Sequence, residues 1–209
     1  MRVMIWGAGP HGKQVADIVR ACGHEIVGFV DADESKVGSE VESGGARVLY
    51  SEDEFLETLD EAPDFHAVVL ALEDNTARLR SYFEVADSLA VPAFIHPSAV
   101  ISPSAAIGDG TVVGAGVVVN AAATVGRVVI LETACVVEHD NRVGDGARVG
   151  CGAVLAGEVS LGERAFVGAG ATVIPGIRVG SDAVVQPGST VIRPVEDGAR
   201  VDGTPARLL

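Results

Sequence analysis

A histidine stands between two carboxylates in the segment VVEHDN, where Glu138, His139 and Asp140 interrupt a long run of small and aliphatic residues. An imidazole takes up and releases protons near neutral pH, which suits it to general acid–base chemistry. A carboxylate bonded to one ring nitrogen fixes the tautomer and raises the basicity of the other nitrogen. The segment therefore predicts a general base; the alternative is an exposed histidine on a turn with no catalytic role.

The residues around this segment repeat with a period of six from residue 95 to residue 191. The repeating aliphatic positions are Ile95, Ile101, Ile107, Val113, Val119, Val125, Leu131, Val137, Val143, Val149, Leu155, Leu161, Val167, Val173, Val179, Val185 and Val191. The position four residues after each is mostly small or β-branched, and we expect it to point inward at a tight corner. This period predicts a parallel β-helix of hexapeptide repeats, in which three short strands and three turns make a coil of about eighteen residues.

His139 occupies the third place of its hexad, which is an outward turn position. One coil further along the chain is Gly157, and one coil back is Ala121. Paired strands lie about 4.8 Å apart, so we expect these three residues to stack on one edge, with the N–H of Gly157 near the imidazole. A base beside an N–H donor is the minimum apparatus for acyl transfer.

A metal site is not expected. The repeat region contains two histidines, His96 and His139, and their separation of 43 positions is not a whole number of coils. Cys22, Cys135 and Cys151 lack the CxxC spacing of a zinc knuckle, and their odd number does not predict a disulfide framework. We expect buried or incidental thiols.

The first half of the chain follows a different pattern. Short apolar strands are predicted at 2–6, 25–31 and 66–72, and they alternate with predicted helices at 13–22, 51–59 and 75–89. Alternating strands and helices predict a small Rossmann-like parallel sheet. We therefore expect an α/β domain at 1–94, a β-helix at 95–193 and a C-terminal tail at 194–209, where Pro194 breaks the period.

The first predicted turn, GAGPHG from Gly7 to Gly12, fits the dinucleotide pattern GxGxxG, and Asp31 closes the second predicted strand. A domain of about 94 residues is too short for both halves of an NAD-binding fold, and His11 is unusual in a loop that packs a redox cofactor's phosphates. These features disfavour an NAD-dependent oxidoreductase and favour a nucleoside diphosphate at the helix N-terminus. A tight turn without a ligand stays open.

The composition and net charge of the chain limit the kinds of partner that it can bind. The net charge of −14 and the pI near 4.6 oppose binding to nucleic acid and to anionic membranes. We expect no membrane insertion and a cytoplasmic location, because apolar runs fall short of the roughly 18 residues of a span and the N-terminus reads as a strand rather than a signal peptide. The acidic, lysine-poor composition is typical of proteins from a high-salt cytoplasm. The alternative is an ordinary acidic surface encoded by a GC-rich genome.

Seven segments together resemble the NeuD/PglD-like sugar O/N-acyltransferases over essentially the whole chain. They are GAGPHG, FVDAD, ALEDNTAR, FIHPSAVISPSA, VVEHD, GAVLAGEVSLGERAFVGAGATVIPGIRVG and VDGTPARLL. The resemblance implies a left-handed β-helix that forms a homotrimer with active sites between neighbours. It also implies acetyl-CoA as the donor and a sugar nucleotide, often UDP-linked, as the acceptor.

The resemblance further implies individual roles. His139 matches the general base, Asp140 the acid that raises its basicity, and Gly157 the backbone donor to the carbonyl oxygen. Five residues match the acetyl-CoA site: Arg148, Ala169, Pro187, Gly203 and Arg207. Six match the acceptor site: Gly9, Pro10, His11, Asp31, Ala32 and Glu73.

Three positions depart from the family pattern. Arg148 stands where well-known relatives carry a second histidine, Glu132 where some carry asparagine, and Glu73 where a glycine approaches the sugar nucleotide. The departure at Glu73 affects the acceptor more than the reaction, whereas Arg148 could bind a phosphate or serve the trimer interface. The sequence therefore predicts an acetyl-CoA-dependent sugar acetyltransferase, with N- or O-acylation, the acyl chain length and the acceptor open. The alternative is a non-catalytic nucleotide-sugar-binding partner in a sugar biosynthesis pathway.

Overall fold

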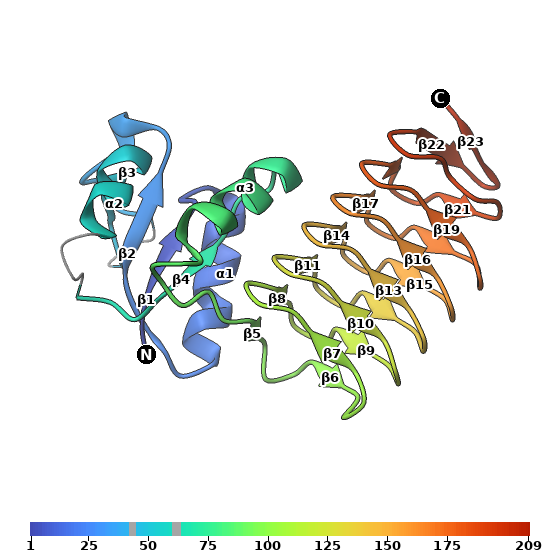
Figure 1. Cartoon of the computed structure of the whole chain (residues 1–209), viewed down its shortest axis with the longest axis horizontal. Helices are drawn as coiled ribbons and strands as arrows, with labels where there is room; N and C mark the ends of the chain where they lie inside the picture. The colour runs from blue at the N-terminus through green and yellow to red at the C-terminus, as the bar shows by residue number, and fades with distance from the viewer. Residues whose placement is uncertain (42–44, 60–63) are drawn as a thin grey trace. The chain divides into compact units, whose positions relative to one another are not determined.

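The structure is a computed structural model that describes residues 1–41, 45–59 and 64–209. Its contacts divide the chain into two compact units, Met1–Phe94 and Ile95–Leu209. Figure 1 shows both units, coloured along the chain.

The first unit is a parallel sheet with helices. Its strands and helices are β1 (Arg2–Trp6), α1 (Pro10–Ala21), β2 (Glu25–Asp31), a short 3-10 helix η1 (Glu34–Lys36), β3 (Val48–Ser51), α2 (Glu52–Thr58), β4 (Ala67–Leu70) and α3 (Asn75–Val85). The strand order is β3-β2-β1-β4, and every pairing is parallel. The central strand β1 is almost entirely buried, as is β4. The predicted α/β fold is confirmed.

The helices of this unit begin at identifiable caps. Ser51 and Glu54 form a capping box at α2, and Asp74 accepts a hydrogen bond from the N–H of Ala77 at α3. Helix α1 starts at Pro10, three residues before the predicted start, because proline is favoured at the first helical position. His11 therefore lies in the first turn of α1 rather than in the preceding loop.

Strand β3 was not predicted from the sequence. It contains only four residues, too few to show a clear alternation. It pairs in parallel with β2 through Val48, Tyr50 and Ser51, and it forms one edge of the sheet. The parallel sheet thus has four strands rather than the three expected.

The second unit consists of short strands, which recur every six residues as far as Val191. They are β5 (Phe94–Ile95), β6 (Val100–Ile101), β7 (Ala106–Ile107), β8 (Val112–Val113), β9 (Val118–Val119), β10 (Thr124–Val125), β11 (Ile130–Leu131), β12 (Val136–Val137), β13 (Arg142–Val143), β14 (Arg148–Val149), β15 (Val154–Leu155), β16 (Ser160–Leu161), β17 (Phe166–Val167), β18 (Thr172–Val173), β19 (Arg178–Val179), β20 (Val184–Val185), β21 (Thr190–Val191), β22 (Arg200–Gly203) and β23 (Ala206–Leu208). The successive coils are visible in Figure 1.

These strands form the three faces of a prism. Every third strand belongs to the same sheet: β5 to β20 by way of β14, β6 to β21 by way of β12, and β7 to β19 by way of β13; β22 and β23 extend the first of these sheets. We call them the β14 face, the β12 face and the β13 face. Neighbouring strands pair in parallel at intervals of eighteen residues, as Val136 does with Val118 and Val154. The second residue of most strands is buried in one continuous aliphatic core, which confirms the left-handed β-helix of hexapeptide repeats.

The last coil is shorter than the others. Val185 of β20 pairs with Val201 of β22 across sixteen positions, and Val179 forms a bridge to Val195. Both Val195 and Val201 are buried, so the coil continues past the break that Pro194 makes in the sequence period. Strand β23 then turns back antiparallel to β22 and ends the β14 face. Among the described residues, no helix has the length and apolar character to cross a membrane.

Candidate active site

His139 and Asp140 lie on the turn between β12 and β13, at the corner where the β12 and β13 faces meet. The Nδ1 atom of His139 is 2.8 Å from Oδ2 of Asp140. Asp140 has a φ of 58°, in the left-handed region, which aspartate and asparagine tolerate better than most residues. Both side chains are more than half exposed, so the imidazole is open to solvent and to a ligand.

The hydrogen bond to Asp140 defines the protonation of the ring. Because an ionised carboxylate only accepts hydrogen bonds, Nδ1 carries a hydrogen and Nε2 of the neutral ring keeps its lone pair. The pKa of His139 is raised above its ordinary value, chiefly by the Asp140 hydrogen bond and also by the nearby carboxylates of Glu138 and Glu158. The turn therefore presents Nε2 as a base of increased strength.

Gly157 lies against this imidazole, one coil further along the chain. The coils are aligned here by the N–H of Glu158, which donates to the carbonyl of His139 over 3.0 Å. A Cβ atom added to Gly157 would stand 2.5 Å from Nε2 and 2.6 Å from Cε1 of His139. The glycine does not have a left-handed φ, and the equivalent position is Ala121 two coils earlier and Pro175 in the next coil. The histidine ring, rather than the backbone conformation, therefore requires a glycine at this position.

The backbone N–H of Gly157 is available to a ligand. Within the part of the chain that the structure describes, it donates to no protein acceptor. This places an uncommitted N–H donor beside the basic Nε2 of His139. A base and an oxyanion donor that share one small space can deprotonate a nucleophile and stabilise the negative charge on a carbonyl oxygen under attack.

The predicted acetyl-CoA residues occupy another part of the prism. Ala169 and Pro187 lie on successive turns of the corner between the β14 and β12 faces, where the N–H of Gly188 donates to the carbonyl of Ala169. Both residues are exposed. Gly203 and Arg207 lie further along, in β22 and β23. These four residues therefore follow one edge of the prism toward its C-terminal end.

Arg148 lies on the β14 face and is tied to its neighbours. Its Nε donates to Oε1 of Glu132 over 2.6 Å, and its guanidinium lies 5.5 Å from the centroid of the Phe166 ring. The other oxygen of Glu132 accepts from the N–H and Sγ of Cys151, each at 3.0 Å. These hydrogen bonds and the arginine charge outweigh the burial of Glu132, and its pKa is lowered. The two departures from the family pattern in this region thus form one ion pair.

Arg148 and His139 cannot act together within one prism. His139 lies at the corner between the β12 and β13 faces, whereas Arg148 belongs to the third face, opposite that corner. The aliphatic core fills the space between them. If both residues contact one acetyl-CoA molecule, a second copy of the chain must supply one of them.

Three of the predicted acceptor residues lie on loops at the carboxyl edge of the sheet in the first unit. Gly9 follows β1, Ala32 follows β2 and Glu73 follows β4, and these three strands are adjacent, with β1 in the middle. Ligands of open parallel sheets bind outside the carboxyl ends of the strands. Ala32 and Glu73 are exposed and Gly9 is partly exposed, so all three are accessible.

Packing explains two of the three glycines in the GAGPHG segment. Gly7 has a φ of 120°, and a Cβ on it would stand 2.6 Å from the carbonyl oxygen of Ala71; a Cβ on Gly12 would overlap the carbonyl of Gly7. A Cβ on Gly9 would meet no atom within 4 Å. Internal contacts therefore do not account for Gly9, which is the glycine that a ligand could approach most closely.

The remaining acceptor residues lie at the end of β2 and in the first turn of α1. Asp31 accepts hydrogen bonds from the N–H of Ala8, from the N–H of Asp33 and from Nζ of Lys36, at 2.9–3.0 Å. Together these interactions outweigh its burial and lower its pKa. His11 is buried, with Nδ1 3.4 Å from Oε1 of Gln14, whereas Pro10 is exposed.

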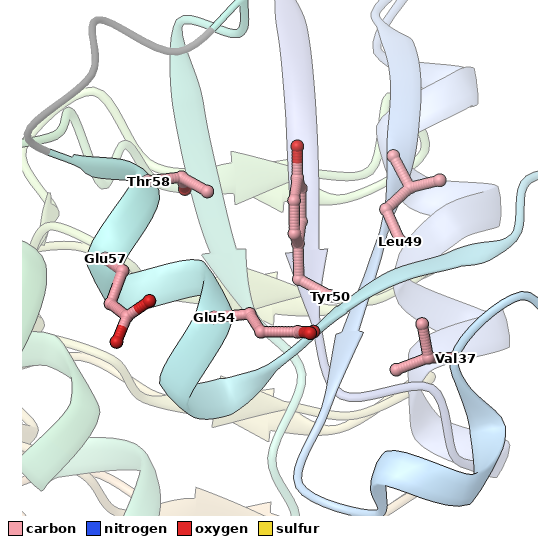
Figure 2. Close-up of a pocket in the computed structure, with 6 residues that line it drawn as sticks. All are labelled: Val37, Leu49, Tyr50, Glu54, Glu57 and Thr58. Atoms are coloured by element: carbon pink, nitrogen blue, oxygen red, sulfur yellow. The ribbon is translucent and has the colours of Figure 1, made fainter.

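A hollow of about 360 Å³ lies on a different part of the first unit, and Figure 2 shows the residues around it. It is lined by Val37, Leu49, Tyr50, Glu54, Glu57 and Thr58. None of the predicted acceptor residues lines it. Its two glutamates would repel a diphosphate, so we do not assign the acceptor to this hollow.

Two buried polar residues near the predicted sites were not found from the sequence. Asn141 occupies an inward hexad position behind the His139 turn, where its polarity was the available signal. Arg78 is fully buried and donates to the carbonyl of Leu72 and to Oδ1 of Asn75, which holds the loop that carries Glu73. In residues 1–41, 45–59 and 64–209, no group of three or more His, Cys, Asp or Glu side chains is arranged to hold a metal ion.

Comparison with protein families gives three matches. The PglD N-terminal domain matches residues 2–85. The bacterial transferase hexapeptide (six repeats) matches residues 158–193, and the hexapeptide repeat of succinyl-transferase matches residues 98–121. No curated protein matches the chain.

Solved structures resemble the chain over its whole length. PerB from Caulobacter crescentus, in complex with CoA and GDP-perosamine, is 36% identical with a TM-score of 0.91, and the match covers 100% of this chain and 97% of that one. The acetyltransferase domain of PglB from Neisseria gonorrhoeae FA1090, in complex with acetyl coenzyme A, is 31% identical with a TM-score of 0.88, covering 100% and 98%. WeeI from Acinetobacter baumannii AYE, at 22% identity, 100% coverage of both chains and a TM-score of 0.81, shares the fold.

The contact between Asp140 and His139 predicts a measurable pKa change. Asp140→Asn replaces the charged acceptor by a neutral amide, so the pKa of His139 should fall toward its ordinary value. Asparagine also tolerates the left-handed conformation at this position. The pKa is measured by NMR titration of the imidazole resonances. Glu138→Gln is the control and should give a smaller decrease, because Glu138 is not bonded to the ring; an unchanged pKa in Asp140→Asn would show that the contact is not formed in solution.

Proposed function

The chain belongs to the NeuD/PglD-like family of hexapeptide-repeat sugar acetyltransferases, and from this premise we propose that it transfers the acetyl group of acetyl-CoA to an amino group of a nucleotide-linked sugar. The amino group follows from similarity to the perosamine N-acetyltransferase of Caulobacter crescentus, which is 36% identical. The observation that carries the proposal is the placement of the His139 imidazole against Gly157, with Asp140 on Nδ1. A UDP or GDP carrier fits the proposal equally.

The proposed reaction uses His139 and Gly157, which lie at the corner between the β12 and β13 faces; we call this corner, with Asp140, the catalytic corner. The sugar amine attacks the thioester carbonyl carbon and gives a proton to Nε2 of His139. The N–H of Gly157 donates a hydrogen bond to the resulting oxyanion. The intermediate then collapses, the carbon–sulfur bond breaks, and the CoA thiolate takes the proton from the imidazolium. Asp140 stabilises that imidazolium through the hydrogen bond to Nδ1.

The first test is removal of the base. His139→Ala should lower the turnover number by roughly 10²–10⁴, because general base catalysis contributes that much. The side chain is more than half exposed, so the fold should survive. Release of the CoA thiol measures turnover on a panel of UDP- and GDP-linked amino sugars, and calorimetry measures acetyl-CoA binding.

His96→Ala is the matched control, because His96 lies in an early coil away from the catalytic corner. It should keep the wild-type rate. Nearly full activity in His139→Ala would exclude this residue as the base. A wild-type protein that binds a sugar nucleotide but neither binds acetyl-CoA nor releases thiol would instead be a non-catalytic binding partner.

The opposite positions of His139 and Arg148 support a site shared between copies of the chain. We propose a closed homotrimer in which each donor groove lies between the catalytic corner of one copy and the β14 face of its neighbour. A threefold ring completes three equivalent sites in this way. Ala169, Pro187, Gly203 and Arg207 would follow the donor along the neighbour's edge.

Mixed assemblies test the shared site. His139→Ala and Arg148→Ala subunits should each have low activity alone. Mixed and reassembled one to one, they should regain about one quarter of the wild-type sites, since each site takes one residue from each of two neighbours. Light scattering should report a trimer. Mixtures no more active than the average of their parents would contradict a shared site, and full activity of Arg148→Ala would contradict its role.

The acceptor loop predicts a selective kinetic change. Gly9→Leu should raise the Michaelis constant for the sugar nucleotide by about tenfold or more, since one hydrogen bond to a charged group contributes about 1.5–3 kcal/mol. The Michaelis constant for acetyl-CoA should stay nearly unchanged. Gly9→Ala is the graded control, because open space at this position accommodates a Cβ. A weakened acetyl-CoA affinity would instead assign the loop to the donor.

A further inference from the structure

Asn141 is an asparagine at a position where most hexads place a small apolar residue. It directly follows His139 and Asp140 on the turn between β12 and β13, and it is fully buried. The equivalent position is alanine at 123 and 147, cysteine at 135 and valine at 159. A polar amide at this point of an aliphatic core needs a reason beyond packing.

The Nδ2 group of Asn141 links two coils at the catalytic corner. It lies 2.7 Å from the carbonyl oxygen of Glu138, 3.1 Å from that of Ala156 and 3.2 Å from that of Leu155. Two hydrogens on Nδ2 are shared among these three acceptors. Asn141 thus contacts the backbone directly before His139 and directly before Gly157.

The contact with Ala156 acts on the oxyanion donor through one peptide group. The carbonyl of Ala156 and the N–H of Gly157 belong to the same planar amide, so a donor that holds the oxygen also sets the direction of the N–H. Hydrogen bonds in series polarise one another, and a bonded carbonyl makes its own N–H a stronger donor. The carbonyl of Glu138 stands in the same relation to the N–H of His139.

Stability alone does not explain this residue. The Oδ1 atom of Asn141 is buried and accepts no hydrogen bond from any residue that the structure describes. A buried acceptor without a partner costs free energy that an alanine would avoid. The side-chain amide of Asn141 therefore makes three contacts through Nδ2 at the cost of a buried Oδ1 that accepts no hydrogen bond from the described residues.

We propose that Asn141 is a positioning residue that aligns the N–H of Gly157 for the oxyanion and polarises it, while holding the coil of Gly157 at a fixed distance from the His139 turn. This inference rests on the proposed acetyl transfer. It adds to that function a buried side chain that acts on the reaction through a backbone amide.

The first experiment separates an effect on catalysis from an effect on stability. Asn141→Ala should lower the turnover number roughly 10- to 100-fold, less than the 10²–10³ for complete loss of an oxyanion donor. Both Michaelis constants should stay within about twofold, since neither substrate touches the buried amide. Asn141→Ser should lose less, because one hydroxyl can still donate to one carbonyl. Alanine and serine both occur at this hexad position, at Ala123 and Ser189, so both variants suit the fold.

Thr111→Ala is the matched control. Thr111 is also buried at the inward position, where its Oγ1 donates to the carbonyl of Gly126 over 2.8 Å and accepts from the N–H of Val129 over 3.1 Å. Its loss removes hydrogen bonds between coils without touching the catalytic turn. Thr111→Ala should lower the melting temperature and keep the turnover number. Equal losses of turnover in both variants would reduce Asn141 to a structural role and overturn the proposal.

The second experiment observes the Gly157 amide directly. Carbonyl-¹³C alanine combined with ¹⁵N glycine marks the amides of the Ala–Gly pairs at Gly9, Gly116, Gly157 and Gly170. The Gly157 resonance is assigned by its absence in Gly157→Ala. In Asn141→Ala it should move upfield while the other three stay in place, because the amide loses its polarising donor.

The outcomes distinguish the role of Asn141 from the proposed acetyl transfer itself. An unmoved Gly157 resonance, or an unchanged turnover number in Asn141→Ala, overturns the role of Asn141 while leaving the acetyltransferase intact. A wild-type protein that releases no CoA thiol overturns the proposed function, whatever the resonance does.

Discussion

The alignment of each residue with the one eighteen positions later is the constraint on which the proposed catalytic corner depends. Val136 of β12 pairs in parallel with Val154 of β15. The turn that follows β12 therefore lies beside the equivalent turn of the next coil, which follows β15. This alignment alone brings His139 against Gly157, although the two residues are far apart in the chain. A slip of one residue would move the aliphatic positions out of the core, so the register that stabilises the prism also determines the geometry of the site.

Much of the second unit could be predicted because its period is a direct consequence of its geometry. Six residues make one strand and one turn, so counting places His139 on a corner and Gly157 above it. Counting does not show which contacts an inward side chain makes, and the hydrogen bonds of Asn141 to three carbonyls were therefore missed. Nor does it show that Glu132 and Arg148, sixteen positions apart, form one ion pair on adjacent coils.

In the first unit, the sequence pattern had more than one physical interpretation. GAGPHG fits a phosphate-binding turn, but Gly7 and Gly12 are required by contacts with the backbone of the unit itself. Gly9 is the one glycine of this segment whose added Cβ would meet no atom within 4 Å, and the spacing of the glycines does not reveal this difference. Strand β3 was missed because four residues carry little periodicity, and His11 was expected in a loop because the start of α1 at Pro10 was not recognised.

The stacked coils also make distance along the prism a discrete quantity. Each coil adds about 4.8 Å, the spacing of paired strands, and intermediate lengths are not available without a break in pairing. The axial separation between the His139 corner and the β22–β23 end can therefore change only by whole coils. Insertion or loss of eighteen residues between them would change the length of the proposed donor groove by one coil and leave the residues of the His139 corner unchanged. In such a scaffold, the number of coils, and therefore the length of the chain, determines how long a bound molecule can be.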